Sequence, residues 1–128
     1  MPLRPRALLG TALLVGAALL GCGEPDVAHH ARQATGGEPA RGRQAILRHG
    51  CRTCHHIPGV PGARGSVGPS LAHVAGRMVL AGDLPNTPEN LIAWIRHPQR
   101  LEPGTVMPEM GIGEQEGRDI AAYLYTLR

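Results

Sequence analysis

The pentapeptide Cys51-Arg52-Thr53-Cys54-His55 restricts the possible folds of this chain more than any other feature of the sequence. Two thiols separated by two residues and followed directly by a histidine form the C-x-x-C-H pattern of covalent haem attachment. In that chemistry Cys51 and Cys54 form thioethers with the two vinyl groups of the porphyrin, and the imidazole of His55 becomes the proximal ligand of the iron. The motif therefore predicts a fold built around one covalently bound haem c.

The amino-acid composition favours a core that a cofactor completes. The chain has 128 residues, and its aromatic residues are Trp94, Tyr123 and Tyr125, with no Phe. That length predicts a single domain. A buried porphyrin would supply the apolar area of several missing Phe side chains. The 18 Gly and 12 Pro predict short helices separated by loops.

Two other kinds of site use a C-x-x-C pair. A structural zinc site needs four ligands, whereas the third cysteine of the chain, Cys22, lies in a predicted export signal. A thioredoxin-like dithiol follows a strand in a βαβ unit, whereas Ala45-Ile46-Leu47 before the motif are typical of a helix. Haem attachment is the interpretation that the surrounding sequence favours.

The N-terminal segment predicts export and lipidation. Two arginines precede an apolar run over residues 7–20, which is too short to span a bilayer as a helix. The run leads into Leu-Leu-Gly-Cys at residues 19–22, which resembles the bacterial lipobox. We expect residues 1–21 to be a lipoprotein signal peptide and Cys22 to carry the lipid, at the periplasmic side or outer face of the cytoplasmic membrane. The alternative is an ordinary signal peptide cut nearby, which leaves Cys22 as a free thiol.

The charge balance gives no indication of nucleic-acid binding. All 13 basic residues are Arg, and the formal net charge falls from +3 to +1 when residues 1–21 are removed. A nearly neutral mature chain lacks the basic excess with which proteins neutralise phosphates.

Residues 22–40 are predicted to be a flexible tether. After Cys22 they read GEPDVAHHARQATGGEPA, which has no apolar periodicity and many Gly, Pro and polar residues. Eighteen flexible residues have a root-mean-square reach of roughly 20–25 Å. His29 and His30 are expected to be solvated there, and the folded domain is expected over residues 41–128.

Residues 41–128 resemble the class I cytochrome c family. Residues 42–50 before the first cysteine resemble the N-terminal helix of the family, in which Gly42 would let the C-terminal helix cross closely. Gly68-Pro69-Ser70-Leu71 is similar to the G-P-x-L loop of the family. The resemblance implies that the carbonyl oxygen of Pro69 accepts the Nδ1 hydrogen of His55 and so orients the ring.

A second helix is predicted after residue 87. Thr87 is a good N-cap, Pro88 suits the first helical position, and Pro98 ends the helix. Trp94 on this helix is expected to pack in the core, and the resemblance places it near the distal side of the haem, where its indole can donate a hydrogen bond.

The segment Pro103-Gly104-Thr105-Val106-Met107-Pro108 resembles the family loop that carries the sixth iron ligand. The resemblance makes Met107 that ligand and includes Thr105 among the cofactor-binding residues. Met110 is an alternative in principle, and Met78 is expected to be packing. A thioether favours Fe(II) and leaves no open position on the iron.

The last helix is predicted over residues 114–128, with an apolar stripe that includes Ile120, Leu124 and Leu127. The four remaining histidines of the domain share no site in the sequence pattern, and we assign them no chemistry: His49, His56, His73 and His97.

The charge of the domain is unevenly distributed along the chain. Residues 41–100 carry eight Arg against two acidic residues. The family resemblance implies that this segment surrounds an exposed haem edge, to which Arg52, Arg64, Arg96 and Arg100 would contribute, and the basic charge predicts an acidic patch on the partner. The alternative is that these arginines are scattered and solvated, and that docking is apolar.

The resemblance implies an all-α protein of three to five short helices around one haem, with electron transfer rather than catalysis as its function. Residues 84–108 most resemble the cytochrome c domains associated with subunit II of bacterial terminal oxidases, which implies electron delivery to an oxidase. A haem subunit of a periplasmic dehydrogenase complex would share the same residues. A ligand-binding or peroxidatic haem protein is a further alternative, but it would need an open iron.

Overall fold

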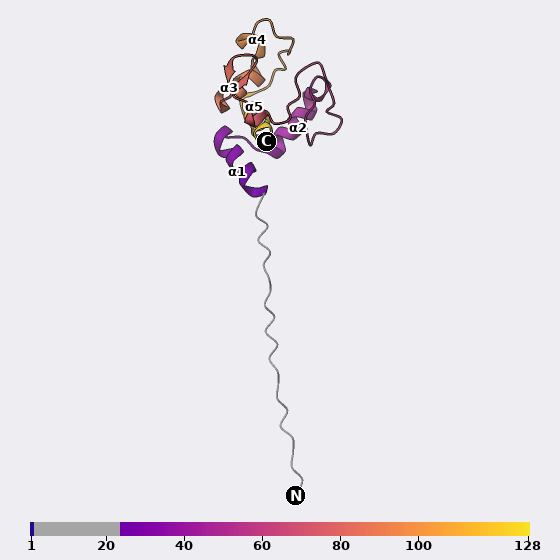
Figure 1. Ribbon diagram of the computed structural model, residues 1–128, viewed down its shortest axis with the longest axis vertical. Helices are drawn as coiled ribbons and strands as arrows, with labels where there is room; N and C mark the ends of the chain where they lie inside the picture. Colours follow the sequence, from indigo (N-terminus) through magenta and orange to yellow (C-terminus); the bar gives the residue numbers. More distant parts are fainter. Residues whose placement is uncertain (2–23) are drawn as a thin grey trace.

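The computed structural model describes Met1 and residues 24–128 (Figure 1). The elements follow one another as α1 (Glu24–Thr35), α2 (Pro39–Arg48), the 3₁₀ turn η1 (Cys51–Thr53), η2 (Val74–Gly76), β1 (Val79–Leu80), β2 (Leu84–Pro85), α3 (Pro88–Arg96), α4 (Pro98–Leu101) and α5 (Glu114–Tyr125). The prediction of an all-α fold with short helices is confirmed. The only sheet in this described part is the two-stranded antiparallel pair of β1 and β2.

The boundaries of α3 follow from local chemistry. The Thr87 side chain accepts a hydrogen bond from the backbone N–H of Asn90 at 3.2 Å, and Pro88 occupies the first turn. Both features satisfy or remove N–H groups that a helix start leaves without partners. The predicted N-cap is therefore confirmed.

The crossing of α2 and α5 organises the domain. A Cβ atom on Gly42 would lie 1.9 Å from the backbone oxygen of Asp119, so only glycine lets the two helices approach this closely. This confirms the predicted contact of Gly42 with the C-terminal helix. α5 also packs against α3 and therefore lies between α2 and α3.

The core is aliphatic. Its buried side chains form one cluster, which includes Ile46, Ile57, Val74, Leu91, Ile95, Ile120 and Leu124. Tyr123 and Tyr125 lie at the edge of this cluster and are only partly buried. The core thus lacks buried aromatic rings, and Trp94, which was expected to pack in it, is only partly buried and outside this cluster.

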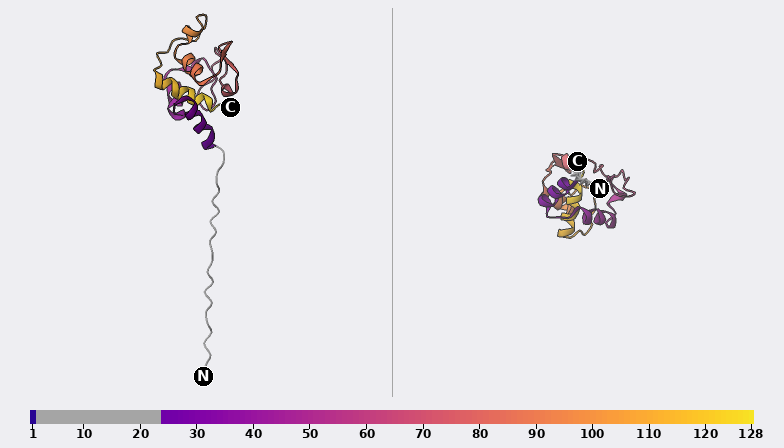
Figure 2. Two further views of the ribbon diagram at one scale, coloured as in Figure 1. Left: turned by 90° about the vertical axis from the view of Figure 1, so that its left-hand side faces the viewer. Right: turned by 90° about the horizontal axis from the view of Figure 1, so that it is seen from below.

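Residues 24–35 form a helix, so the prediction of a flexible tether is wrong for this segment. α1 packs against α5 and α3, and Ala31 and Thr35 are buried. The physical reason is that the contact face of α1 is made of small residues, which bury little area each and produce no strong apolar periodicity in the sequence. Figure 2 shows α1 lying against the folded body and not apart from it.

The predicted signal peptide beyond Met1 and the predicted lipidation site Cys22 lie outside the described residues. Within residues 24–128, no helix has both the length and the apolar character needed to cross a membrane.

Candidate cofactor site

A cavity of about 860 Å³ opens between α2, α3, α5 and the loops that connect them. Its volume lies within the range of about 300–1,000 Å³ that is usual for ligand pockets. Aliphatic side chains from all three helices line it, among them Ile46, Leu91, Ile95, Ile120 and Leu124. The cavity is also lined by every cofactor-binding residue that the sequence predicts: Cys51, Cys54, His55, Pro69, Trp94, Thr105 and Met107.

One wall of the cavity carries the C-x-x-C-H motif. Gly50 has a φ of 70°, a left-handed conformation that ends α2 and starts the η1 turn. The backbone N–H groups of Cys54 and His55 both donate to the carbonyl oxygen of Cys51, at 3.2 and 3.0 Å. This tight turn brings both thiols and the imidazole to the same cavity. Both thiols are free, and burial raises the pKa of the Cys51 thiol.

The imidazole of His55 is held by the loop at Gly68 and Pro69. Its Nδ1 lies 2.7 Å from the carbonyl oxygen of Pro69, the contact that the family resemblance implies. Gly68 donates its N–H to the carbonyl oxygen of Cys54 at 2.8 Å. A Cβ atom on Gly68 would lie 2.4 Å from Cε1 of His55, so the loop passes directly against the ring. With Nδ1 occupied as a donor, Nε2 is the nitrogen available as a metal ligand.

The loop after α4 supplies Thr105 and Met107. The backbone N–H of Thr105 donates to the carbonyl oxygen of Glu102 at 3.0 Å, and the N–H of Met107 donates to Oγ1 of Thr105 at 3.2 Å. Thr105 therefore orders the backbone immediately before Met107. Met110 also lines the cavity, but it packs against the aliphatic core.

Met78 does not pack, contrary to its expected role. Its side chain is 89% exposed, next to the first residue of β1. The apolar appearance of residues 78–80 comes from a two-residue strand in which Leu80 is buried and Val79 is exposed. Because successive side chains of a strand point to opposite faces, only one of these neighbouring apolar side chains is buried.

Arg77 lines the cavity and was missed by the sequence analysis. Its Nη2 donates to the carbonyl oxygen of Ser70, and its own carbonyl oxygen accepts from Nδ2 of Asn86 at 2.9 Å. Arg77 thus joins the segment after Pro69 to the hairpin that precedes α3. No local pattern identifies it, because its partners, the carbonyl oxygen of Ser70 and the side-chain amide of Asn86, lie in other loops.

His49 is a second cavity residue that the sequence did not single out. Its Nε2 lies 2.7 Å from one carboxylate oxygen of Glu116, and Nη2 of Arg48 lies 2.7 Å from the other. These hydrogen bonds, first from Arg48 and then from His49, hold the pKa of Glu116 below its ordinary value. The pair fastens the C-terminal end of α2 to α5.

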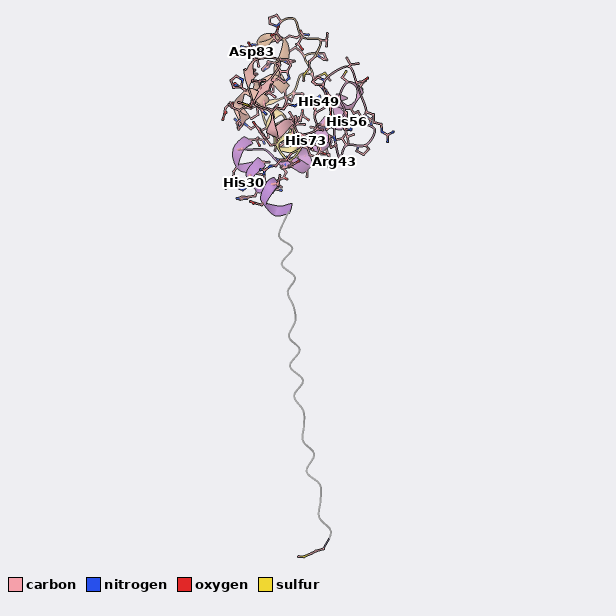
Figure 3. All side chains as sticks on the ribbon, in the orientation of Figure 1. His30, Arg43, His49, His56, His73 and Asp83 are labelled. Carbon is pink, nitrogen blue, oxygen red and sulfur yellow. The ribbon has the colours of Figure 1, made fainter. Side chains whose placement is uncertain are left out.

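Besides His49, Figure 3 labels His30, His56 and His73, which are exposed and lie at separate places. In the part of the chain that the structure describes, no three His, Cys, Asp or Glu side chains are grouped so as to hold a metal ion.

The four arginines predicted to surround the haem edge are not among the residues that line the cavity. Arg52, Arg64 and Arg100 are exposed, but the stem of Arg96 lies against Gly117 and its Nε is buried without a hydrogen-bond partner. Arg96 packs against α5 and is half-buried, so it is less exposed than the other three. Three exposed valines line the opening itself: Val67, Val79 and Val106.

The donor set and the cavity fit a c-type haem. Two free thiols, an imidazole with an oriented ring and a thioether open onto one largely aliphatic space. These are the groups that attach and ligate haem c, and the aliphatic lining suits a porphyrin face.

Comparisons with known proteins agree with this arrangement. The family model described as "Cytochrome c" matches residues 39–128. The chain is 39% identical over 89 residues to "Cytochrome c oxidase subunit 2" of Alkalihalophilus pseudofirmus, covering 69% of this chain and 25% of that protein. It is 35% identical over 106 residues to "Cytochrome c2" of Rhodopila globiformis, covering 72% of this chain and 95% of that protein.

The match to the oxidase subunit is thus confined to about a quarter of that protein, whereas the match to the cytochrome c2 spans nearly all of it. The family model covers α2 to α5 and the whole lining of the cavity. By sequence and by fold, this chain belongs to the cytochrome c family and is a class I c-type cytochrome.

Proposed function

We propose that this protein carries single electrons to a terminal oxidase in a membrane-associated respiratory chain, through one haem c whose iron His55 and Met107 would bind. Covalent haem c and electron transfer follow from the family. The observation that carries the finer proposal is the cavity itself, which is lined by the C-x-x-C-H motif and by the Met107 loop.

When bound, haem c supplies an iron that exchanges one electron between Fe(II) and Fe(III). The chain provides the thiols of Cys51 and Cys54 for attachment and the Nε2 of His55 as one ligand. The Pro69 carbonyl, 2.7 Å from Nδ1, orients the His55 ring. Thr105 orders the loop so that the Met107 thioether is presented to the cavity.

The lining of the cavity would keep water away from the cofactor. Ile46, Leu91 and Ile120 are buried and face this space. Arg77 is the arginine among the lining residues and is suited to a porphyrin carboxylate, while Trp94 lines the cavity from α3 and can donate its indole N–H. A low-dielectric surrounding with few mobile dipoles lowers the reorganisation that accompanies a change in charge.

Delivery to an oxidase is supported by the similarity to a protein named cytochrome c oxidase subunit 2. We further propose that the chain is exported and that Cys22 carries a lipid, because the Leu-Leu-Gly-Cys pattern follows a short apolar run. The proposed location is the outer face of the cytoplasmic membrane.

The test is oxidation of the purified, reduced protein by membranes that contain the oxidase. We expect oxidation that cyanide inhibits and that the Met107→Ala variant slows strongly. The matched control is Met110→Ala, which changes a methionine three residues away that packs in the core. Oxidation that cyanide leaves unchanged would contradict an oxidase as the acceptor.

A further inference from the structure

The helix α1 (Glu24–Thr35) lies outside residues 39–128, which match the family model, yet it is part of the folded body. It packs against α5 and α3. Its residues Ala31 and Thr35 are 3% and 1% exposed, which is as deeply buried as the aliphatic core. α1 is therefore an addition to the family domain that shares its packing.

The end of α1 is fastened to α5 by hydrogen bonds. Nη1 of Arg118 donates to the carbonyl oxygen of Thr35 at 3.2 Å, and Nε2 of Gln115 donates to that of Gly36 at 3.2 Å. These two contacts satisfy carbonyl oxygens that the end of a helix leaves without partners.

The link from α1 to α2 is equally restrained. The N–H of Glu38 donates to Oδ1 of Asp119 at 2.7 Å, and Arg32 forms two hydrogen bonds with the Glu38 carboxylate, at 2.7 and 2.9 Å. A Cβ atom on Gly37 would lie 2.1 Å from the backbone oxygen of Arg118, so this backbone runs directly against α5. The link therefore leaves α1 little freedom to swing.

α1 covers the side of α5 that faces away from the cavity. Ile120 and Leu124 of α5 line the cavity, whereas Gln115 and Arg118 hold α1. On a helix with 3.6 residues per turn, Arg118 and Ile120 point in nearly opposite directions. In Figures 1 and 2, α1 and α4 also lie at opposite ends of the folded part, and the Met107 loop follows α4.

We propose that α1 is a docked spacer that fixes the orientation of this cytochrome on a lipid surface and holds the cavity on the side away from the bilayer. The inference rests on the lipid attachment at Cys22 proposed above. In the sequence, Gly23 alone separates Cys22 from Glu24, the first residue of α1. A lipid on Cys22 would thus hold the α1 end of the body at the membrane surface.

The orientation defines the kind of partner that can exchange electrons with this protein. The docking site of such a partner lies in the aqueous phase above the bilayer, on a peripheral protein or on an extramembrane domain. A site level with the lipid headgroups would meet α1 instead of the cavity opening. The exposed valines at that opening, Val67, Val79 and Val106, are then available to the partner.

The test measures the distance of two positions from the membrane surface in the full lipidated haem protein. A nitroxide is attached at Asp26→Cys in α1 or at Gln99→Cys in α4, both exposed. The reduced protein is bound to vesicles of phosphatidylethanolamine and phosphatidylglycerol that contain a Ni(II)-chelating lipid. We expect the nickel to enhance relaxation of the label at position 26 several-fold more than that at position 99.

Two variants test whether docking of α1 causes the difference. Gly37→Ala forces the link off α5, and Gln115→Ala combined with Arg118→Ala removes the two bonds to the end of α1 while leaving the core intact. Either should raise the relaxation of the label at position 99 toward that at position 26, because the body is then free to turn while position 26 stays close to Cys22. The matched control is Gly76→Ala, where a Cβ atom meets no atom within 4 Å and the difference should persist.

Equal relaxation at both positions of a protein that pellets with the vesicles would overturn the fixed orientation and leave lipid attachment standing. A stronger effect at position 99 would overturn it as well. A protein that stays in the supernatant with the mass of an unlipidated chain would overturn lipid attachment, and the orientation with it. Hydrogen exchange of the α1 amides, which we expect to be slow with or without the lipid, then reports separately whether α1 is docked.

Discussion

The backbone of Gly68 lies directly against the imidazole of His55, where a Cβ atom would be 2.4 Å from Cε1. The next residue, Pro69, holds Nδ1 of the same ring through its carbonyl oxygen. The two contacts restrain the ring from its face and from its edge. The orientation of the His55 ring therefore depends on the backbone of Gly68 and Pro69, and position 68 has no room for a side chain.

The first prediction concerns this close approach. Gly68→Ala should displace the His55 ring and lower the melting temperature, since forcing a methyl group into a packed site costs about 1–3 kcal/mol. In a domain of this size that corresponds to a fall of several degrees, on the order of 4–8 °C per kcal/mol. Gly76→Ala is the control, because a Cβ atom there meets nothing within 4 Å. Equal losses in the two variants would refute the role of Gly68.

The second prediction separates the two methionines. Met107→Ala should abolish the absorption band of thioether-to-iron charge transfer and lower the reduction potential, because a thioether ligand stabilises Fe(II). Met110→Ala should keep the band and lose stability, toward the low end of the range of about 2–5 kcal/mol for such truncations, because Met110 packs against the core. Visible spectra and thermal melts distinguish the two effects. The reverse outcome would reassign the ligand.

The third prediction concerns stability in acid. Burial opposes ionisation of Asp119, but hydrogen bonds from Arg41, from the backbone of Glu38 and from Gln115 outweigh it and hold its pKa below the ordinary value. A carboxyl whose pKa is lower in the folded state contributes stability above the unfolded-state pKa of about 4, and this stability is lost as the pH falls through the folded-state pKa.

Asp119→Asn should therefore destabilise the protein by about 2 kcal/mol near neutral pH, since a charged hydrogen-bonded pair is lost. Its stability should also fall less steeply than that of the wild type below pH about 4. Urea unfolding at several values from about pH 3 to about pH 7, a range that includes the unfolded-state pKa of about 4, measures the loss of stability near neutral pH and its slope in acid. Parallel curves for the two proteins would exclude Asp119 as the source of the acid sensitivity.

The fourth prediction concerns attachment to the membrane. Cys22→Ser should move the haem protein from the membrane fraction to the soluble fraction, because bacterial lipoprotein cysteines carry more than one acyl chain and each buried CH₂ contributes about 0.8 kcal/mol. Gentle lysis followed by haem staining of both fractions measures this. A wild-type protein found entirely in the soluble fraction would disprove lipid anchoring.

The features that could be predicted from the sequence are carried by short, consecutive motifs. The η1 turn follows from the four residues from Cys51 to Cys54, and the start of α3 from the Thr87 cap and Pro88. The placement of His55 beside Pro69 came from the family resemblance, which supplies long-range contacts that local propensity cannot. The η1 turn and the cap of α3 could be predicted because their hydrogen bonds join residues only a few positions apart.

The features that were missed depend on contacts between distant segments. α1 is stabilised by its packing on α5, and its own small side chains give little periodicity. Arg96 looks like a surface arginine, but α5 covers its stem at Gly117. Arg77 links the loop at Ser70 to Asn86 through one hydrogen bond to each. In each case tertiary packing, which has no fixed spacing in the sequence, decides the environment.

The most direct test of the central claim is a spectroelectrochemical titration of the purified protein, after denaturation has shown that its haem is covalently bound. We predict a single reversible wave with a one-electron slope that follows the haem absorbance, and loss of the bound haem when Cys51 and Cys54 are both changed to Ser. A colourless protein whose redox change needs two electrons and follows the Cys51 and Cys54 thiols would contradict the account and identify a dithiol instead.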